Sequence, residues 1–239
     1  MITNFRSLIL KVVSEILSVL FYSFYKLFYK KVAHPKAILF VDSKKILKNI
    51  DKGSIVRQRR LYLTGVILSG SWDEEFQWLF SDLGFNYLFE DLSRLTENNL
   101  TIEKSHWYEV RKDKCKTPSD IESIKEEVDK KMKKYYKIYQ KIKTDGFIIP
   151  RSVFDKTDFF YVCISANGDY LFMTGNHRLI IAKILALRGY NIKIPVRVSH
   201  RHSKWQAFRD ELYVKYKKNI LTRRDIENIG HEDLIDIIS

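Results

Sequence analysis

The residues with the clearest chemical potential form one short run, Gly175-Asn176-His177-Arg178, directly before an apolar stretch that predicts a helix over 177–188. A helix N-terminus presents unpaired backbone N–H groups and a partial positive charge, and both favour a bound phosphate. Glycine lets a ligand approach the backbone, Arg178 can add a bidentate contact, and His177 can supply a hydrogen bond or a proton. The run therefore predicts an anion site, with local capping and pairing as the alternative.

A hairpin must position this run. Asn167-Gly168 stands between two apolar, β-prone segments, and this dipeptide is the strongest short-range signal of a hairpin turn. The second arm of the hairpin meets Thr174-Gly175 and gives way to the helix. A strand that passes through glycine into a helix leaves the first N–H groups of that helix facing whatever lies in front of them.

The bulk composition points to a polyanionic partner. The chain has 239 residues, an ordinary apolar fraction of 45% and a formal net charge of +13. Such a charge attracts nucleic acid, acidic lipid headgroups or a phosphorylated small molecule, although a merely soluble basic surface would have the same composition. The two cysteines, Cys115 and Cys163, have no paired or metal-type spacing, which suits a reducing compartment.

Residues 5–31 form the most apolar segment and predict an amphipathic helix. Its polar residues recur every three or four positions and form one stripe, while aliphatic and aromatic residues fill the remainder. The uninterrupted apolar part, Ile16 to Tyr25, is too short for a transmembrane span, and no small-residue cleavage site indicates a signal peptide. Two interpretations remain: a helix in a membrane interface with Lys26, Lys30 and Lys31 toward the headgroups, or a helix packed on the protein's own core or on a second copy.

The remaining pattern predicts an α/β fold, in the α+β sense, with several extra helices. We expect strands at 37–41, within 61–68 and at 192–200, and helices at 43–50, around 76–80, at 83–95, at 119–144 and from residue 203 onward, with two short helices at the end. The predicted organisation is an amphipathic, membrane-apposed helix (1–34), an α/β first half (35–118), a charged helix (119–144), a core domain (145–216) and C-terminal helices (217–239).

Several segments, taken in order, resemble the ParB/sulfiredoxin-like superfamily over about residues 145 to 211. The matching segments are Asp145-Gly146, Ile164 to Arg178, Ile184-Leu185, Ile194-Pro195-Val196 and Arg201-His202. The superfamily includes chromosome-partition ParB proteins, sulfiredoxins and free-serine kinases. In its small α/β core a Gly-x-x-Arg-type turn holds nucleotide phosphate, so the resemblance implies that role for Gly175, Asn176, His177 and Arg178.

A closer resemblance is to an uncharacterised group of prokaryotic ParB-like proteins that are often encoded near surface-polysaccharide genes. The shared motifs are the Gly175-x-His177-Arg178-Leu179 turn, the helix from Ile181 to Leu185, the run Arg201-His202-x-x-Trp205-Gln206 with Arg209-Asp210-Glu211 after it, and a weaker upstream match at Gly70-Ser71-Trp72-Asp73. The chain departs from the better-known relatives. Asn176 stands where sulfiredoxins need cysteine, and no arginine-rich box or helix-turn-helix domain follows the core as in ParB.

The His-Arg turn is most similar to that of the kinase branch, which implies ATP or ADP with Mg²⁺ as the cofactor. A kinase needs a carboxylate to accept the hydroxyl proton, and Asp73 with Glu74 behind it is the predicted group, since it follows a strand-like segment and a glycine turn. Capping of a following helix is the alternative for Asp73. His177 is the second predicted catalytic residue, and Arg151, Arg201 and His202 complete the predicted nucleotide-binding set. No metal ligand set is recognisable.

Three functions remain open at this point. The first is a nucleotide-binding protein with phosphotransferase activity on a small or carbohydrate-linked hydroxyl, in the cytoplasm or at the inner face of the membrane. The second is a nucleic-acid-binding ParB-like module or nuclease, which the +13 charge motivates. The third is a non-enzymatic scaffold at an anionic membrane surface. The sequence does not decide whether catalysis occurs, which substrate is used, or the oligomeric state.

Overall fold

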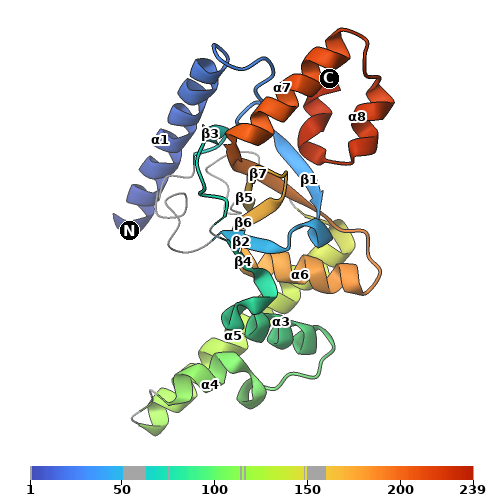
Figure 1. The fold of residues 1–239 in the computed structure, drawn as a ribbon. Helices are drawn as coiled ribbons and strands as arrows, with labels where there is room; N and C mark the ends of the chain where they lie inside the picture. The colour runs from blue at the N-terminus through green and yellow to red at the C-terminus, as the bar shows by residue number, and fades with distance from the viewer. Residues whose placement is uncertain are drawn as a thin grey trace. The chain divides into compact units, whose positions relative to one another are not determined.

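We describe the protein from a computed structural model, which covers residues 2–50, 63–74, 76–113, 115, 117–147, 149 and 160–238, with side chains from Ile9 onward. It is a mixed α/β protein, as the sequence predicts, and it divides into two compact units (Figure 1). The first unit contains residues 1–78, 149–175 and 194–239, and the second contains residues 79–148 and 176–193. The boundary after Gly175 therefore falls inside the predicted core domain 145–216.

A mixed sheet forms the centre of the first unit. In the described residues its strands are β1 (Ile38–Asp42), β2 (Lys48–Ile50), β3 (Val66–Leu68), β4 (Phe76–Trp78), β5 (Phe160–Ile164), β6 (Tyr170–Thr174) and β7 (Lys193–His202). The order is β1-β7-β5-β6-β2-β4, and β3 also pairs with β7. The strand β5 runs antiparallel to β6 and parallel to β7. Because β5, β6 and β7 are the central strands, most of their side chains are buried.

The predicted hairpin is confirmed. Gly168 has a positive φ of 87°, and its N–H donates to the Ser165 carbonyl at 3.1 Å, which closes the turn between β5 and β6. The ring of Trp205 covers this glycine so closely that an added Cβ would lie 2.6 Å from it. Both the backbone conformation and the lack of space therefore require glycine at position 168.

Two predicted helices are wrong. Asp42 does accept from the Lys44 N–H as a cap, but the helix it opens is a single 3₁₀ turn, Ser43–Lys45, followed by β2. The segment predicted as a helix around 76–80 instead contains β4 and a 3₁₀ turn, Leu79–Ser81. These two short strands pair with each other, and β2 also pairs with β6, so their conformation depends on partners that a local pattern does not contain.

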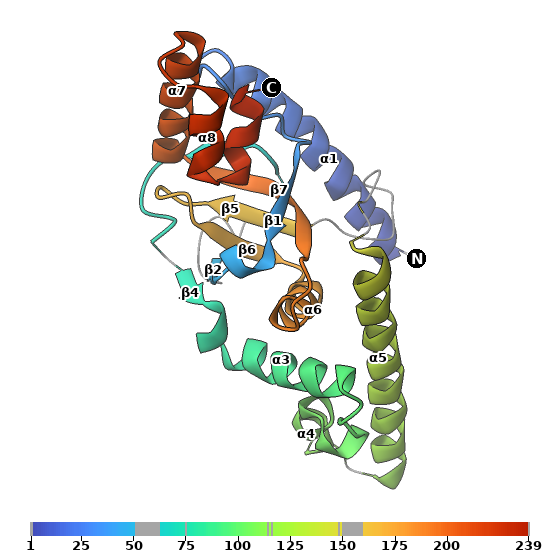
Figure 2. The ribbon, with the colours of Figure 1, turned by 90° about the vertical axis from the view of Figure 1, so that its right-hand side faces the viewer.

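Helices complete the first unit. The helix α1 (Ile2–Tyr25) lies beside the sheet (Figure 2), and α7 (Ser203–Lys217), α8 (Arg223–Ile229) and the 3₁₀ helix Glu232–Ile238 follow β7. The predicted strand before α7 and the two short C-terminal helices are confirmed. Among the described residues, none of the helices has the length and apolar content required to cross a bilayer.

The second unit is helical in its described part. It contains α3 (Leu83–Thr96), a 3₁₀ turn at Ile102–Lys104, α4 (His106–Lys112), α5 (Pro118–Asp145) and α6 (Asn176–Leu187). The predicted helices at 83–95, 119–144 and 177–188 are confirmed. Thr117 and Asp120 form a capping box at the start of α5, and Gly146 with φ of 74° ends it. The helix α6 packs against both α3 and α5.

Candidate functional site

The predicted phosphate turn begins at a glycine whose backbone conformation is unusual. Gly175 has a φ of 102°, and α6 starts at the next residue. Every residue of α6 from Leu179 to Ala186 is buried, so the helix is fixed as a core element of the second unit. Its first backbone N–H groups have no carbonyl partner within the helix, which makes this end a fixed source of positive potential.

An aromatic stack holds His177 in the first turn of α6. Its imidazole lies parallel to the Tyr135 ring of α5, with 4.3 Å between the centroids and 13° between the planes. The ring of Tyr135 also contacts Trp107 of α4, with centroids 5.6 Å apart. Burial is the main reason that the pKa of His177 falls from 6.5 to about 4, so the ring is neutral near pH 7.

Two lysines of α5 add positive charge beside this ring. The Nζ of Lys131 lies 4.9 Å from the Trp107 centroid, and that of Lys134 lies 5.8 Å from the Tyr135 centroid. After burial, these two ammonium groups are the next causes of the lowered pKa of His177. Burial and then Arg111 lower the pKa of Lys131 as well. We call Trp107, Lys131, Lys134, Tyr135 and His177 the His177 cluster, and all of its residues belong to the second unit.

The lysines of this cluster differ from the adjacent lysines on the same helix. Lys130 pairs with Glu126 at 3.4 Å, and Lys133 pairs with Asp129 at 2.7 Å. Within the described residues, no carboxylate lies within 4.0 Å of Lys131 or Lys134. The lysine one residue before each cluster lysine therefore has a close ion pair, whereas Glu127 and Asp91 act on Lys131 only from beyond ion-pair distance.

Hydrogen bonds outside the cluster fix its supporting helices. The carboxylate of Asp91 is fully buried and accepts from the backbone N–H of His106 at 3.2 Å, which anchors the start of α4 just before Trp107. At the other end of α6, the guanidinium of Arg188 donates to the Tyr139 hydroxyl at 2.9 Å and to Glu97 at 2.9 Å. These bonds fix the start of α4 and the C-terminal end of α6, the two helices that carry Trp107 and His177.

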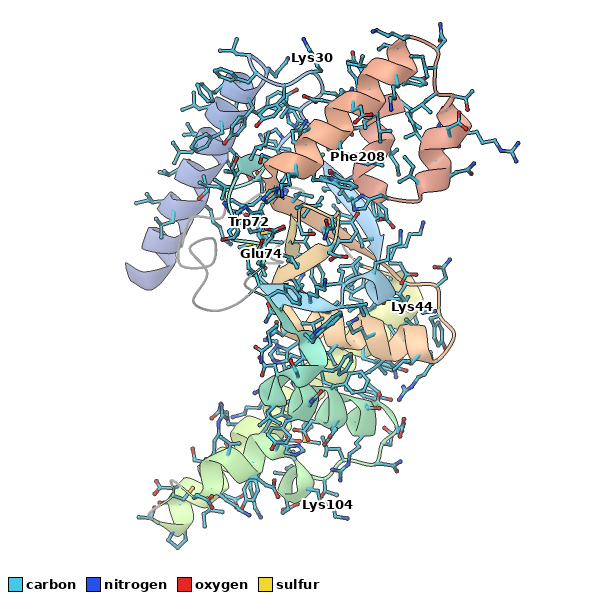
Figure 3. All side chains as sticks on the ribbon, in the orientation of Figure 1. Lys30, Lys44, Trp72, Glu74, Lys104 and Phe208 are labelled. Carbon is cyan, nitrogen blue, oxygen red and sulfur yellow. The ribbon has the colours of Figure 1, made fainter. Side chains whose placement is uncertain are left out.

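Asp73 lies in a different part of the first unit from the Gly175 turn. Its Oδ2 accepts from the Ala166 N–H at 2.7 Å, so it holds the hairpin turn that precedes β6. Its chain neighbours Trp72 and Glu74 are labelled in Figure 3. Gly175 follows the opposite end of β6. One five-residue strand, about 16 Å long, lies between them. The structure therefore does not bring this carboxylate to the Gly175 turn, and the described residues that follow Asp73 lead into β4 and not into a helix that it could cap.

His202 occupies a structural position near Asp73. Its Nδ1 accepts from the Lys204 N–H at 3.1 Å and so caps α7, which leaves Nε2 to donate to the Gly70 carbonyl at 2.7 Å. The Asp73 carboxylate is 3.7 Å from the same Nε2. Both ring nitrogens are engaged and the side chain is buried, so His202 has no free atom for a phosphate.

Arg201 is buried in an ion-pair network. Its guanidinium binds Asp233 through two nitrogens at 2.5 to 3.1 Å, and Asp233 also accepts from the Trp205 indole N–H at 3.0 Å. Arg209 pairs with the same carboxylate at 2.9 Å. Although burial opposes ionisation of Asp233, the two guanidinium groups hold its pKa well below the usual range. A phosphate could reach Arg201 only if this network opened.

The predicted site residues therefore separate into groups. Gly175, Asn176, His177 and Arg178 are consecutive, and Arg178 is half-buried in the first turn of α6. Asp73 and His202 lie together near the hairpin turn, while Arg151 lies outside the described residues. The sequence interpretation missed Trp107, Lys131, Lys134 and Tyr135. The apolar stripe of α5 that contains Tyr135 was visible, but periodicity does not reveal which element a stripe packs against.

Comparisons with known proteins do not assign the chain to a family. Searches against protein-family models, curated proteins and solved structures each find no match for the chain. Within the described residues, no group of three or more His, Cys, Asp and Glu side chains has a metal-binding arrangement. The candidate site rests on the His177 cluster and the start of α6.

Proposed function

We propose that the protein binds a phosphate-bearing small molecule, with a nucleotide as the first candidate, at the first turn of α6. The carrying observation is that Lys131 and Lys134 lie beside a neutral His177 at a helix N-terminus and, within the described residues, have no carboxylate within ion-pair distance. Phosphate oxygens would accept from the N–H groups of α6 and from the lysines. Of the two aromatic rings in the cluster, Trp107 is half-buried and offers a partly exposed surface suited to a base, whereas Tyr135 is buried.

Nucleotide binding is a separate proposal from phosphoryl transfer, which requires further catalytic groups. The resemblance to the kinase branch supports ATP or ADP with Mg²⁺ and transfer to a small or carbohydrate-linked hydroxyl. Such a reaction needs a group that accepts the hydroxyl proton close to the transferred phosphate. Asp73 holds the hairpin turn at the far end of β6 from Gly175, so we no longer give it this task. We propose transfer as an activity to assay once binding is measured.

Calorimetry with matched lysine variants tests this proposal. We would titrate ATP, ADP and CTP, with and without Mg²⁺, into the full chain and into Lys131→Gln, Lys134→Gln and Arg178→Ala. The controls are Lys130→Gln and Lys133→Gln, which remove equal charge from the same helix where it is already paired. We expect the two cluster lysine variants and Arg178→Ala to bind about tenfold more weakly or worse, because each loses a charge-assisted contact, and the controls to change less than about twofold.

Two results would contradict the proposal. If none of these nucleotides binds the wild-type chain, the assignment is wrong. If the control and cluster lysine variants weaken binding equally, nucleotide binding depends on the overall positive charge of the protein and not on the His177 cluster.

We also propose that the protein works at an anionic membrane surface. The support is the exposed apolar face of α1 together with the net charge of +13, because apolar area and basic charge act jointly in interfacial helices. A protein held at a membrane would have access to lipid-linked carbohydrate, which agrees with the resemblance to proteins encoded near polysaccharide genes.

A further inference from the structure

Helix α1 turns its polar side toward the sheet. Ser14 and Ser18 are buried, and the Ser18 hydroxyl accepts from the buried Thr64 N–H at 2.9 Å. The Tyr25 hydroxyl donates to the Ile67 carbonyl of β3 at 3.0 Å. Glu15 pairs with Arg197 of β7, whose side chain is also buried. The helix is therefore attached to the rest of the first unit through its polar stripe.

The opposite side of α1 is apolar and open. Its large aliphatic and aromatic residues are exposed by 37 to 78% at Ile9, Leu10, Val13, Ile16, Val19, Leu20 and Phe24, and at Leu27 and Phe28 in the turn that follows. Within it, Val13, Ile16, Leu20 and Phe24 recur at intervals of three and four, so they form one row along the helix. We call these nine residues the α1 apolar row. Figure 3 shows side chains of α1 projecting away from the sheet on this side.

This orientation is the reverse of that in an ordinary surface helix, which buries its apolar side and exposes its polar side. A contiguous apolar patch of this kind marks an interaction surface, because water would otherwise solvate it at a free-energy cost. The polar groups on the other side are already satisfied by β3, β7 and Thr64. The occupant of the row must therefore be apolar.

Charge favours a lipid bilayer as that occupant. Lys26 and Lys30 follow the helix directly and are exposed, and the whole chain carries a net charge of +13. An anionic leaflet attracts such a protein, whereas a second copy would bring the same positive charge toward itself. The rings of Phe24 and Phe28 are tilted against each other near this end, with 4.9 Å between their centroids, and aromatic side chains are typical of the membrane boundary.

We infer that α1 stays docked on the sheet through its polar side while the α1 apolar row inserts into one leaflet of an anionic bilayer. This inference rests on the proposed membrane association and names the surface responsible for it. The helix then lies in the plane of the membrane, which agrees with its lack of a span-forming apolar segment. Lys26 and Lys30 contact the phosphate groups of the lipids.

Vesicle co-sedimentation of the full chain tests the inference. The vesicles contain phosphatidylcholine with phosphatidylglycerol, or phosphatidylcholine alone. The test variant is Leu20→Glu/Phe24→Glu, in residues that are 60% and 54% exposed. The control is Leu187→Glu/Ile220→Glu, which places the same charges at residues that are 75% and 64% exposed elsewhere. Circular dichroism verifies that each variant is folded.

We expect wild type to bind the anionic vesicles and to bind less as salt rises, because surface charges are screened. The test variant should lose affinity by about tenfold or more, since its apolar contacts are replaced by anionic groups, and the control should stay within about twofold. If wild type binds but the test variant binds equally well, the inference fails while membrane association stands. If wild type does not bind, both fail.

A second copy is the competing occupant. Light scattering of the lipid-free chain would reveal it as a dimer that the Leu20→Glu/Phe24→Glu variant converts to a monomer. That result, together with absence of vesicle binding, would overturn the inference and assign the row to self-association.

Discussion

The two long helices, α1 of the first unit and α5 of the second, are both amphipathic, but they bury opposite sides. In α5 the apolar residues Val128, Met132 and Tyr139 are buried and most of the lysines face water. In α1, from Ile9 onward, the buried residues are Ser14 and Ser18, and most of the aliphatic residues are exposed. The same periodicity in sequence is thus compatible with either side facing the protein.

The difference teaches that periodicity identifies the two sides of a helix but not the side that the protein uses. For α5 the hydrophobic effect alone selects the buried side. For α1 the selection depends on polar partners, the Thr64 N–H and Arg197, that lie far away in the chain. The exposed sides then acquire different roles: an apolar row on α1, and on α5 the lysines that flank His177.

The largest expected effect is on the buried side of α5. Val128 is fully buried, so Val128→Asp places a carboxylate in the core and should lower the free energy of unfolding by about 4 kcal/mol or more. Urea denaturation followed by circular dichroism measures this change. An effect below about 1 kcal/mol would show that α5 does not pack through this side.

The next largest loss of stability is expected at Ser18, on the buried polar side of α1. Ser18→Ala removes the acceptor of the buried Thr64 N–H, which should cost about 1–3 kcal/mol even though alanine favours a helix more than serine does. The same denaturation experiment applies, with the exposed Ser23→Ala as the control on the same helix. A neutral or stabilising Ser18→Ala would mean that the polar side of α1 does not face the sheet.

A smaller effect is expected on the outer side of α1. In lipid-free solution, Leu20→Glu should change the free energy of unfolding by no more than about 0.5 kcal/mol, because Leu20 is 60% exposed. An ordinary amphipathic helix would lose several times more at a central leucine. A loss of about 2 kcal/mol or more would place Leu20 in a core and contradict the described orientation.

A separate effect, on the pH dependence of stability, is expected at His177 beside the charged side of α5. His177 has a folded pKa of about 4, below its ordinary 6.5, so the unfolded chain binds more protons between these values. Stability is therefore lost as the pH falls through this window. The contribution is on the order of 1 kcal/mol, because solvent screens a partly exposed ring. His177→Asn should flatten this part of the stability profile relative to wild type, and an unchanged profile would exclude His177 as the titrating group.

Local patterns predicted the parts of the fold whose determinants are local. The Asn167-Gly168 turn, β5, β6 and α6 follow from glycine chemistry and apolar runs, and the structure confirms them. The strands β2 and β4 were predicted as helices because each has only three residues and owes its conformation to pairing. A cap such as Asp42 marks where a turn starts but not how far a helix continues.

The candidate site was predictable only in part for the same reason. The run from Gly175 to Arg178 can be recognised because its residues are consecutive. Arg201 and His202 were assigned to phosphate, yet their partners Asp233 and Gly70 are distant in sequence and occupy them. The lysines beside His177 could not be found, since the pairing of α5 with α6 exists only in three dimensions.

The most direct test of the proposed phosphate site is an NMR titration of the His177 ring protons with and without saturating ATP. We predict a pKa of about 4 in the free protein, and a higher pKa with ATP because phosphate charge favours the imidazolium. In Lys131→Gln/Lys134→Gln, ATP should produce a much smaller rise. If the pKa of His177 stays the same when ATP is saturating, the ligand does not occupy the first turn of α6, and the central claim is wrong.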